Sequence, residues 1–446
     1  MIKLNLYNTL QRRLSIFQPI DTQNVRIYAC GPTVYDFIHI GNARPLVVFD
    51  VLVRLLRKIY PKVTYVRNIT DIDDKINKRA IEKKINISEL TNETIKNFHK
   101  DAHALGNLKP DFEPKATDHI SEMIEMIETL ISNGFAYVSS GNVLFAVEKY
   151  NNYGALSGRS LDEMISGSRV EVAEYKKNPG DFILWKPSSE KLPGWDSPWG
   201  RGRPGWHIEC SAMSKKYLGT QFDIHAGGLD LIFPHHENEI AQSCCANKSD
   251  IMANYWLHNG YVTSDGEKMS KSLGNFATIN NLLLNFRGEA IRYALMQAQY
   301  RAPLSFSKKS LDEATKSLSR LYRAVEGFEV NDGQDTQIID NLCDDLNSPK
   351  ALARLHYLAD EANKGSKECA QKLKNSSNIL GILCNSTDEW FKFGEVNSNE
   401  AIENSAMTEK EIDELIIKRK IAKENKEYEK ADQIREQLLE KNIQLE

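Results

Sequence analysis

Two short segments carry side chains suited to binding phosphate groups. Positions 39–42 read His-Ile-Gly-Asn before an apolar stretch with helical spacing, and positions 268–272 read Lys-Met-Ser-Lys-Ser in a loop rich in glycine and serine. The first turn of a helix offers an anion unpaired backbone N–H groups and the positive end of a dipole. His39 can donate a hydrogen bond to a phosphate, and Lys268 and Lys271 can neutralise charge on a pyrophosphate.

Either segment alone has a plainer interpretation. A single histidine at such a position is usually part of the core, and two loop lysines are usually solvated. The segments occur together, in this order, in a chain of 446 residues, and this pairing favours a site for nucleotide phosphates. Within the first segment, Gly41 has no side chain and would let the backbone approach the nucleotide.

A strand, a helix and a second strand must position the first segment. Val25–Ala29 has the composition of a buried strand, and Val63–Arg67 predicts the next one. Between them the helical pattern covers Ala43–Ile59, with Asn42 as the expected N-cap and Pro45 tolerated in the first turn. The order strand–helix–strand is typical of a doubly wound parallel sheet, which binds ligands at the carboxyl ends of its strands.

The rest of the chain predicts an insertion, the second half of the sheet and a helical end. Strand patterns return at 222–225 and 255–262, helical patterns follow residue 306, and two helices are expected at 409–425 and 427–441. We expect an α/β fold in which a doubly wound, Rossmann-like catalytic domain with an insertion precedes an all-helical bundle and a small C-terminal domain. The expected parts are 1–108 and 205–246 for the two halves of the catalytic domain, 109–204 for the connective insertion, 247–306 for the region with the lysine loop, 307–384 for the helical bundle, and 385–446 for a linker and the small C-terminal domain.

The composition is that of a soluble globular protein, with 41% hydrophobic and 26% charged residues. A net charge of −4 gives no global positive field for nucleic acid, although a local basic strip would suffice. The apolar run 46–56 is too short to span a membrane and contains Asp50 and Arg54. Seven cysteines without a disulfide-like pattern favour a reducing compartment. We expect a cytoplasmic protein with no membrane association.

The ordered pair of segments resembles the two ATP-binding motifs of class I aminoacyl-tRNA synthetases. The first motif of that class commonly reads His-Ile-Gly-His, and this chain departs from it with Asn42. Asparagine can still donate a hydrogen bond but carries no charge. The resemblance implies that His39, Lys268 and Lys271 supply most of the phosphate stabilisation, with Asn42 also in the catalytic set, and that Mg²⁺ accompanies ATP. It also implies that Gly41, Gly228, Asp230 and Lys271 bind ATP.

Five further stretches are similar to motifs of the cysteinyl-tRNA synthetase family, over most of the chain. They are Cys30–Thr33, Asn68–Lys75, Gly205–Met213, Asp223–Asp230 and His235–Glu239. In that family one zinc ion lies at the bottom of the amino-acid pocket. The matching ligands here are Cys30, Cys210, His235 and Glu239. The resemblance also implies that Trp206 closes the pocket over the substrate, with Gly31, Thr33, Thr70 and His225 near it.

Spacing alone would not reveal these zinc ligands. Cys30 and Cys210 are 180 residues apart (210 − 30), no Cys-x-x-Cys is present, and buried structural cysteines are the plainer interpretation. His235 and Glu239 are four residues apart and would share one face of a helix, whereas His236 would face another way. Zinc nevertheless suits cysteine. Rejecting serine by about 10⁴ needs about 5.4 kcal/mol, shape gives only about 1–3 kcal/mol, and zinc binds the soft thiolate directly.

The resemblance implies a two-step reaction. The carboxylate of L-cysteine attacks the α-phosphate of ATP, and the 2′-hydroxyl of the terminal adenosine of cysteine tRNA then attacks the cysteinyl-adenylate. The helices after Phe306 would hold the tRNA, and Lys418–Lys420 is either a strip for phosphates or a solvated helix face. We expect a monomer. In the family the chain usually continues past the point that matches Leu445, so we expect a weaker anticodon contact, or one that uses Trp390 and the last two helices.

Two alternatives remain open on the sequence. A cysteine ligase of thiol-cofactor biosynthesis resembles this family, makes the same adenylate and transfers cysteine to a sugar amine instead of tRNA. A non-catalytic tRNA-binding or zinc-binding relative is the second alternative, and the presence of His39, Lys268 and Lys271 argues against it.

Overall fold

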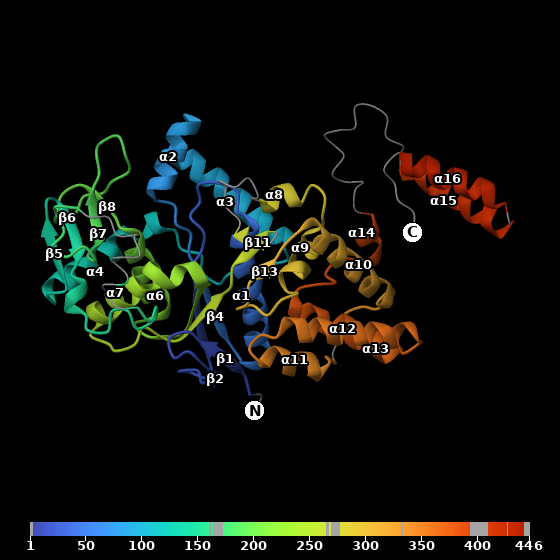
Figure 1. Cartoon of the computed structure of the whole chain (residues 1–446), viewed down its shortest axis with the longest axis horizontal. Coiled ribbons are helices and arrows are strands. Elements are labelled where there is room, and N and C mark those ends of the chain that lie inside the picture. The colour runs from blue at the N-terminus through green and yellow to red at the C-terminus, as the bar shows by residue number, and fades with distance from the viewer. Residues whose placement is uncertain are drawn as a thin grey trace. The chain divides into compact units, whose positions relative to one another are not determined.

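A parallel four-stranded sheet forms the centre of the first part of the chain (Figure 1). Its strands lie in the order β10 (Ala253–Asn259), β9 (Phe222–Gly228), β3 (Val25–Ala29) and β4 (Val63–Arg67). The chain moves from β3 to β4 on one side, whereas β9 and β10 are added on the other side, so the strand order reverses between β3 and β9. Such a switch point is where open α/β sheets bind ligands, beyond the carboxyl ends of the strands.

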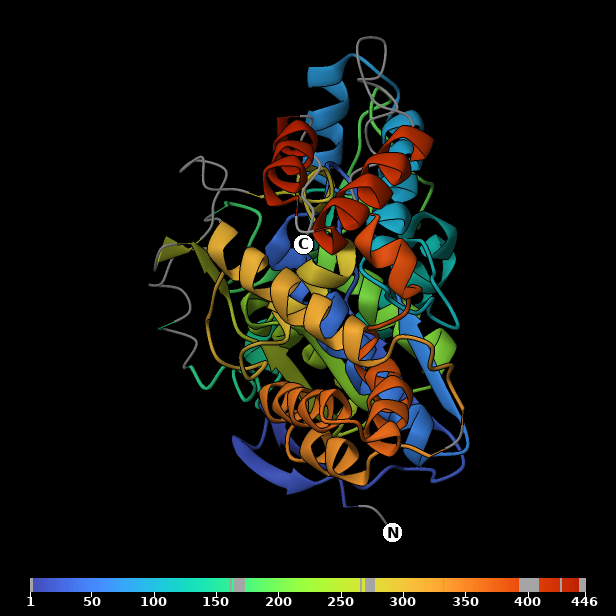
Figure 2. The same cartoon turned by 90° about the vertical axis from the view of Figure 1, so that its right-hand side faces the viewer.

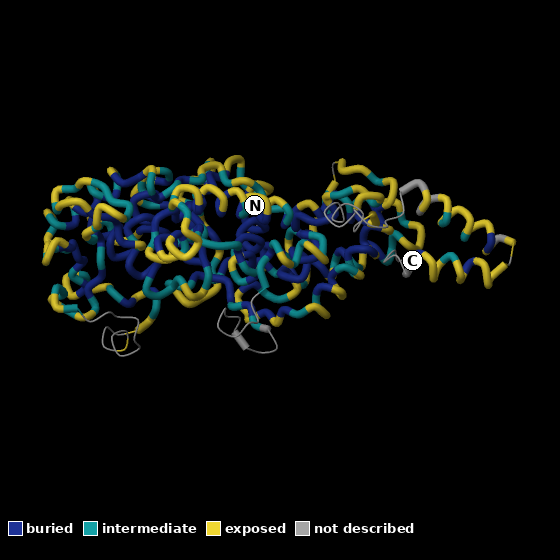
Figure 3. The backbone as a smooth tube through the Cα atoms, turned by 90° about the horizontal axis from the view of Figure 1, so that it is seen from above, coloured by how far each residue is buried: buried dark blue, intermediate teal, exposed yellow. Residues whose placement is uncertain are grey.

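Both faces of this sheet are covered, which explains why its strands are almost continuously apolar. Val25 and Ile27 pack with helix α1 (Ile40–Ile59), whereas Tyr28, one position on, belongs to the core beside α6 (Trp206–Leu218) and α7 (Glu237–Asn247). Successive side chains of a strand point to opposite faces. The residues just after β3 therefore lie where the α1 side and the α6–α7 side meet. Figure 3 shows buried stretches of backbone running through the interior of the first unit.

The computed structural model describes residues 3–159, 163, 173–264, 267–268, 277–331, 333–392, 409–425 and 427–440. It divides into two units, Met1–Phe391 and Lys392–Glu446. Within the described residues, no helix combines the length and the apolar character that crossing a membrane requires.

Helix α1 begins earlier than its apolar pattern predicts. His39 is the N-cap, and Asn42 is the third helical residue, so the prediction of Asn42 as N-cap is wrong. Nδ1 of His39 accepts a hydrogen bond from the backbone N–H of Gly41 at 3.0 Å, and Oδ1 of Asn42 accepts one from the backbone N–H of His39 at 3.3 Å. This reciprocal capping starts the helix at Ile40, because two otherwise unpaired donors are satisfied.

The insertion forms a separate layer beside the parallel sheet. Its helix α4 (Ile120–Ser132) packs near an antiparallel sheet with the order β5-β6-β7-β8. The four strands are β5 (Ala136–Ser139), β6 (Asn142–Phe145), β7 (Phe182–Pro187) and β8 (Gly202–Pro204). The polar segment before the insertion forms α2 (Asp74–Lys83) and α3 (Ile87–Ala104). The N-terminal hairpin consists of β1 (Asn5–Asn8) and β2 (Arg13–Ile16).

A small sheet follows β10. Its order is β12-β11-β13, with β11 (Val262–Ser264), β12 (Glu267–Lys268) and β13 (Leu304–Ser305). The strand predicted at 255–262 is therefore two strands, because the chain leaves the parallel sheet at Gly260. Helices α8 (Ile279–Leu282) and α9 (Gly288–Leu295) come before β13.

The chain after β13 is helical, as predicted (Figure 2). The helices of the first unit are α10 (Lys308–Ala324), α11 (Thr336–Cys343), α12 (Ser348–Asn363), α13 (Lys367–Ser377) and α14 (Thr387–Phe391). Helix α14 lies within the stretch that was expected to be a linker. This stretch is helical here because Trp390 is buried and stacks on Tyr322 with ring centroids 4.7 Å apart. The second unit contains α15 (Glu409–Glu424) and α16 (Tyr428–Glu440), which pack on each other.

Candidate active site and metal centre

Four side chains from distant parts of the sequence meet at the carboxyl ends of β3 and β9. Cys30 follows β3, and Cys210 lies on α6. His235 lies in the π-helical segment Ile232–His236 before α7, and Glu239 lies in the first turn of α7. Sγ of Cys30 lies 3.7 Å from Sγ of Cys210 and 3.6 Å from Oε1 of Glu239. The same carboxylate oxygen lies 3.0 Å from Nε2 of His235. These are the four ligands that the family resemblance implies.

The separations within this group fit one tetrahedral metal ion. Zinc–sulfur bonds of about 2.3 Å place two sulfur ligands about 3.8 Å apart, and a sulfur and an oxygen ligand about 3.5 Å apart. The corresponding distances here are 3.7 Å and 3.6 Å. Two thiols, an imidazole and a carboxylate form a donor set that zinc accepts. The residues therefore fit a zinc ion.

Burial adds a reason for a cation at this place. Cys210, His235 and Glu239 are at most 1% exposed. Burial raises the pKa of the Cys30 thiol well above its usual value and raises the pKa of Cys210 as well. Burial also lowers the pKa of His235 far below its ordinary range, so the imidazole is neutral and can act as a ligand. A bound cation would favour the thiolate forms that bind metals.

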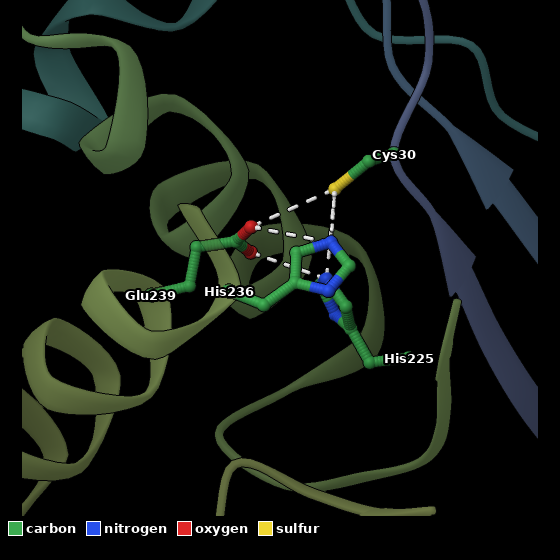
Figure 4. A group of neighbouring side chains, drawn as sticks. All are labelled: Cys30, His225, His236 and Glu239. Carbon is green, nitrogen blue, oxygen red and sulfur yellow. Dashed lines mark hydrogen bonds and ion pairs between the residues drawn. The ribbon is translucent and has the colours of Figure 1, made fainter. Parts of the chain in front are cut away.

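A second group shares two of these residues (Figure 4). It consists of Cys30, His225, His236 and Glu239. Nε2 of His236 lies 3.3 Å from Sγ of Cys30, so the expectation that His236 faces another way is wrong. The reason is local. The segment before α7 is π-helical and contains the non-helical Phe233, and residues three apart, such as His236 and Glu239, also share a side of a helix.

A cavity of about 320 Å³ opens beside the four-ligand group. This volume suits a small molecule. Nine predicted site residues line it, namely Cys30, Gly31, Thr33, His39, Gly41, Asn42, Trp206, Gly228 and Asp230. The other predicted side chains of the pocket, Thr70, Cys210, His225, His235 and Glu239, are almost completely buried. The fold thus brings the candidate phosphate-binding segment and Cys30, one of the four candidate metal ligands, to one cavity.

The contact between His39 and Gly41 sets the tautomer of the histidine ring. Since Nδ1 accepts from the backbone N–H of Gly41, a neutral imidazole carries its proton on Nε2, which is then a donor. A Cβ atom at position 41 would lie 2.8 Å from Cε1 of His39. Gly41 therefore makes room for the ring, a reason that the sequence prediction did not include.

The first turns of α1 hold both ends of the segment that contains the lysine loop. The backbone N–H of Ile40 donates to the carbonyl oxygen of Ala277 at 3.0 Å. One nitrogen of Arg44 donates to the carbonyl oxygens of Gly260 at 2.9 Å and Tyr261 at 2.8 Å. The backbone of Lys268 lies in β12, whereas its side chain and the whole of Lys271 lie outside the described residues.

A hydrogen-bonded chain leads from the loop after β3 to α6. The backbone N–H of Gly31 donates to Oδ1 of Asn68 at 2.9 Å, and Nδ2 of Asn68 donates to Oγ1 of Thr70 at 3.2 Å. The Thr70 hydroxyl then donates to Oε2 of Glu209 at 2.8 Å, and burial raises the pKa of Glu209 well above its usual value. Trp206, at the start of α6, stacks on His235 with ring centroids 4.0 Å apart.

Sequence reasoning missed several residues of this site. Asn68 and Glu209 stand within the motif stretches, but their spacing gives no sign that they bond to the same hydroxyl. Arg44 did leave a signal, because a charged residue interrupts an otherwise apolar helix and is fully buried there. His207 lies beside His235, and His258 lies beside His236. Neither contact could be inferred from the spacing of these residues in the sequence.

The fold and this site are those of a class I aminoacyl-tRNA synthetase. Residues 16–316 match the family model described as the tRNA synthetases class I (C) catalytic domain, and residues 337–385 match the DALR domain. A methionyl-tRNA synthetase from Mycobacterium tuberculosis, solved with methionyl-adenylate, superposes with a TM-score of 0.58 at 14% identity, over 80% of this chain and 89% of that one. At this identity the likeness concerns the fold.

Full-length relatives define the family more closely. A cysteine--tRNA ligase from Rhodospirillum rubrum is 50% identical over 452 residues, which cover 99% of this chain and 97% of the relative. One from Gluconobacter oxydans is 52% identical over 445 residues, which cover 99% and 96% of the two chains. The chain belongs to the cysteine--tRNA ligase family.

Proposed function

We propose that this chain activates L-cysteine with ATP and transfers it to the 2′-hydroxyl of the terminal adenosine of cysteine tRNA. The observation that carries the proposal is the meeting of Cys30, Cys210, His235 and Glu239 beside the cavity that His39 lines. A centre that binds a thiolate and a segment that binds phosphate thus face one space. The full-length similarity to cysteine--tRNA ligases supports the same conclusion.

The four ligands would hold one zinc ion, which when bound supplies a Lewis acid for the substrate thiolate. Trp206, which covers His235, would close over the amino acid, and Gly31, Thr33, Thr70 and His225 would surround it. Bound in this way, the cysteine carboxylate can attack the α-phosphate with no protein nucleophile. Catalysis then rests on position and on electrostatic stabilisation of the phosphates.

The nucleotide would lie across the start of α1. The Nε2–H of His39 would donate to a phosphate, with Asn42 holding the cap that orients the ring. Gly41, Gly228 and Asp230 line the cavity and would contact ATP. Lys268 and Lys271 would neutralise the leaving pyrophosphate together with Mg²⁺.

The remaining parts would serve the tRNA. We assign residues 1–108 and 205–246 to the catalytic domain, 109–204 to the insertion, 247–306 to the region of the lysine loop, 307–384 to a tRNA-binding helical bundle, and 385–446 to the anticodon side. Residues 337–385 of this bundle match the DALR domain. All seven cysteines are free thiols, which supports a cytoplasmic location. A monomer is proposed, and sedimentation measures it.

Exchange of pyrophosphate into ATP tests the first step. The zinc-loaded protein should exchange pyrophosphate only when cysteine is present, and absence of exchange would refute the proposed function. Charging of cysteine tRNA, beside an equal concentration of an amino sugar, tests the second step. Transfer to the amino sugar and not to tRNA would establish the thiol-cofactor ligase instead.

A further inference from the structure

Five of the ten histidines lie in and around the metal centre, yet only one of them, His235, belongs to the four-ligand group. The other four are His207, His225, His236 and His258. We propose that His207 is a positioning residue that fixes the tautomer of His235 for metal binding. The inference rests on the proposed function, because it concerns the same zinc centre.

The argument begins with the two ring nitrogens of His235. Its Nε2 faces Oε1 of Glu239 at 3.0 Å, inside the four-ligand group. Its Nδ1 lies 2.9 Å from Nδ1 of His207. A neutral imidazole has one N–H and one lone pair. If the lone pair of His235 is on Nε2 and binds the metal, the proton is on Nδ1 and must be donated to the lone pair on Nδ1 of His207.

The remaining histidines can be assigned without conflict around one metal ion. Nε2–H of His236 then donates to Sγ of Cys30 at 3.3 Å, and Nε2–H of His225 faces Oε2 of Glu239 at 3.3 Å. Nδ1 of His236 accepts from Nε2–H of His258 at 2.8 Å, and Nδ1 of His258 accepts from the hydroxyl of Thr9 at 2.8 Å.

This assignment makes His225 and His236, the two residues of Figure 4 that are outside the four-ligand group, donors to Glu239 and Cys30 of that group. It also makes His207 the acceptor for His235. Outer partners of this kind orient ligands, and their loss typically weakens metal binding by about 10- to 100-fold.

The surroundings of His207 hold its ring in this orientation. Its ring meets Phe182 edge to face with centroids 5.7 Å apart, and it lies beside Trp206 at 5.3 Å. Trp206 in turn stacks on His235. A variant at position 207 that keeps an acceptor attached to Cγ should therefore preserve the contact. Asparagine has this property, since its Oδ1 occupies the place of Nδ1, whereas leucine has no acceptor and glutamine carries its oxygen one atom further out.

The experiment measures zinc affinity by competition with a chromogenic chelator, using the full-length chain. Three variants are compared with the unchanged protein, namely His207→Asn, His207→Leu and His207→Gln. His119→Leu is the matched control, because His119 is a buried histidine that bonds to Lys115 and Tyr217 away from the metal centre. We expect zinc affinity within about threefold of the unchanged protein for His207→Asn and for the control, and a fall of about 10- to 100-fold for the other two.

The glutamine variant keeps the test decisive if the leucine variant does not fold. Unchanged zinc affinity in His207→Gln, or an equal loss in the asparagine and glutamine variants, would overturn the role of His207. In that case the unchanged protein would still bind zinc and exchange pyrophosphate. If the unchanged protein binds no zinc, the proposed metal centre itself fails, and this inference fails with it.

Discussion

At the scale of single residues, the candidate metal centre shows what a sequence can and cannot predict. His235 and Glu239 are four apart, and helical spacing places them on one side, as the structure has them. Cys30 and Cys210 are 180 residues apart, and only their likeness to a family could pair them before the fold was known. His236 was misjudged because the π-helical segment before α7 does not follow ideal spacing.

Replacing a proposed ligand should affect the amino acid more than the nucleotide. For Cys210→Ser we expect KM for cysteine in pyrophosphate exchange to rise at least about tenfold, with KM for ATP within about twofold, because serine is a harder and weaker zinc ligand. Cys244→Ser is the control, since Cys244 is also buried but lies outside both groups of possible metal ligands. Equal rises in both KM values would contradict the zinc role.

Asp101 on α3 predicts a dependence of stability on pH. Its side chain is 1% exposed, its Oδ2 has no hydrogen-bond partner among the described residues, and burial raises its pKa to about 6. Below about pH 3 this group is protonated in both the folded and the unfolded chain. Between about pH 4 and pH 6 the unfolded chain has lost this proton while the folded chain still binds it, so the free energy of unfolding falls over this interval and stays constant above it.

Asp101→Asn should therefore match the unchanged protein at pH 3 and be more stable by about 3 kcal/mol at pH 8, because each unit of the raised pKa corresponds to about 1.36 kcal/mol. Thermal melting at the two pH values measures the difference, with Glu93→Gln, an exposed acid on the same helix, as the control. A gain that is the same at both pH values would show that the carboxylate charge is not the cause.

At the scale of elements, α1 was predicted in its end, Ile59, but not in its start. The apolar pattern marks the part of the helix that packs on the sheet, whereas the first turn is set by the reciprocal hydrogen bonds of His39 and Asn42, which leave no apolar signal. The two parallel strands β3 and β4 match their predicted bounds, because strands buried on both faces are nearly continuous apolar runs.

Arg44 should matter for catalysis because it ties α1 to the segment before the lysine loop. Burial lowers its pKa to about 10, so it remains charged at neutral pH and donates to three carbonyl oxygens. Arg44→Lys replaces the guanidinium fork with a compact ammonium group. We expect kcat for pyrophosphate exchange to fall about tenfold, with KM for cysteine unchanged. Arg57→Lys, on the exposed side of the same helix, is the control and should have no effect on kcat. A rise in KM for cysteine in Arg44→Lys would instead indicate a general loss of structure.

At the scale of the whole molecule, the helices after residue 306 were predicted, but helix α14 was not. The stretch 385–406 has a linker-like composition, yet Thr387–Phe391 is helical because Trp390 is buried beside Tyr322 and bonds to Ser319. One aromatic side chain can thus place a polar segment in the core, which composition averages do not show. Thr408 and Glu411 have the spacing of a capping box for α15, and Thr408 lies outside the described residues.

The division into two units predicts that activation and transfer can be separated. A chain ending at Phe391 keeps the cavity, the candidate metal ligands and the first unit. We expect its pyrophosphate exchange to stay within about threefold of the full chain, whereas kcat/KM for charging tRNA should fall at least about tenfold because phosphate contacts are lost. Equal loss of both activities would mean that the second unit supports the first step as well.

Because cysteine occupies positions 30 and 210, the fidelity of new copies of this enzyme depends on the cysteinyl-tRNA that the enzyme itself makes. Every new copy of the chain is translated with cysteinyl-tRNA that older copies have charged. If serine is attached by mistake and incorporated at either position, the new copy lacks a soft donor in the proposed zinc site, and we expect it to discriminate less well between the two amino acids. Mischarging with serine would therefore increase the rate of later mischarging. Accurate charging therefore keeps newly made copies accurate. A shortage of cysteine would lower the accuracy of the enzyme that supplies cysteinyl-tRNA to the ribosome.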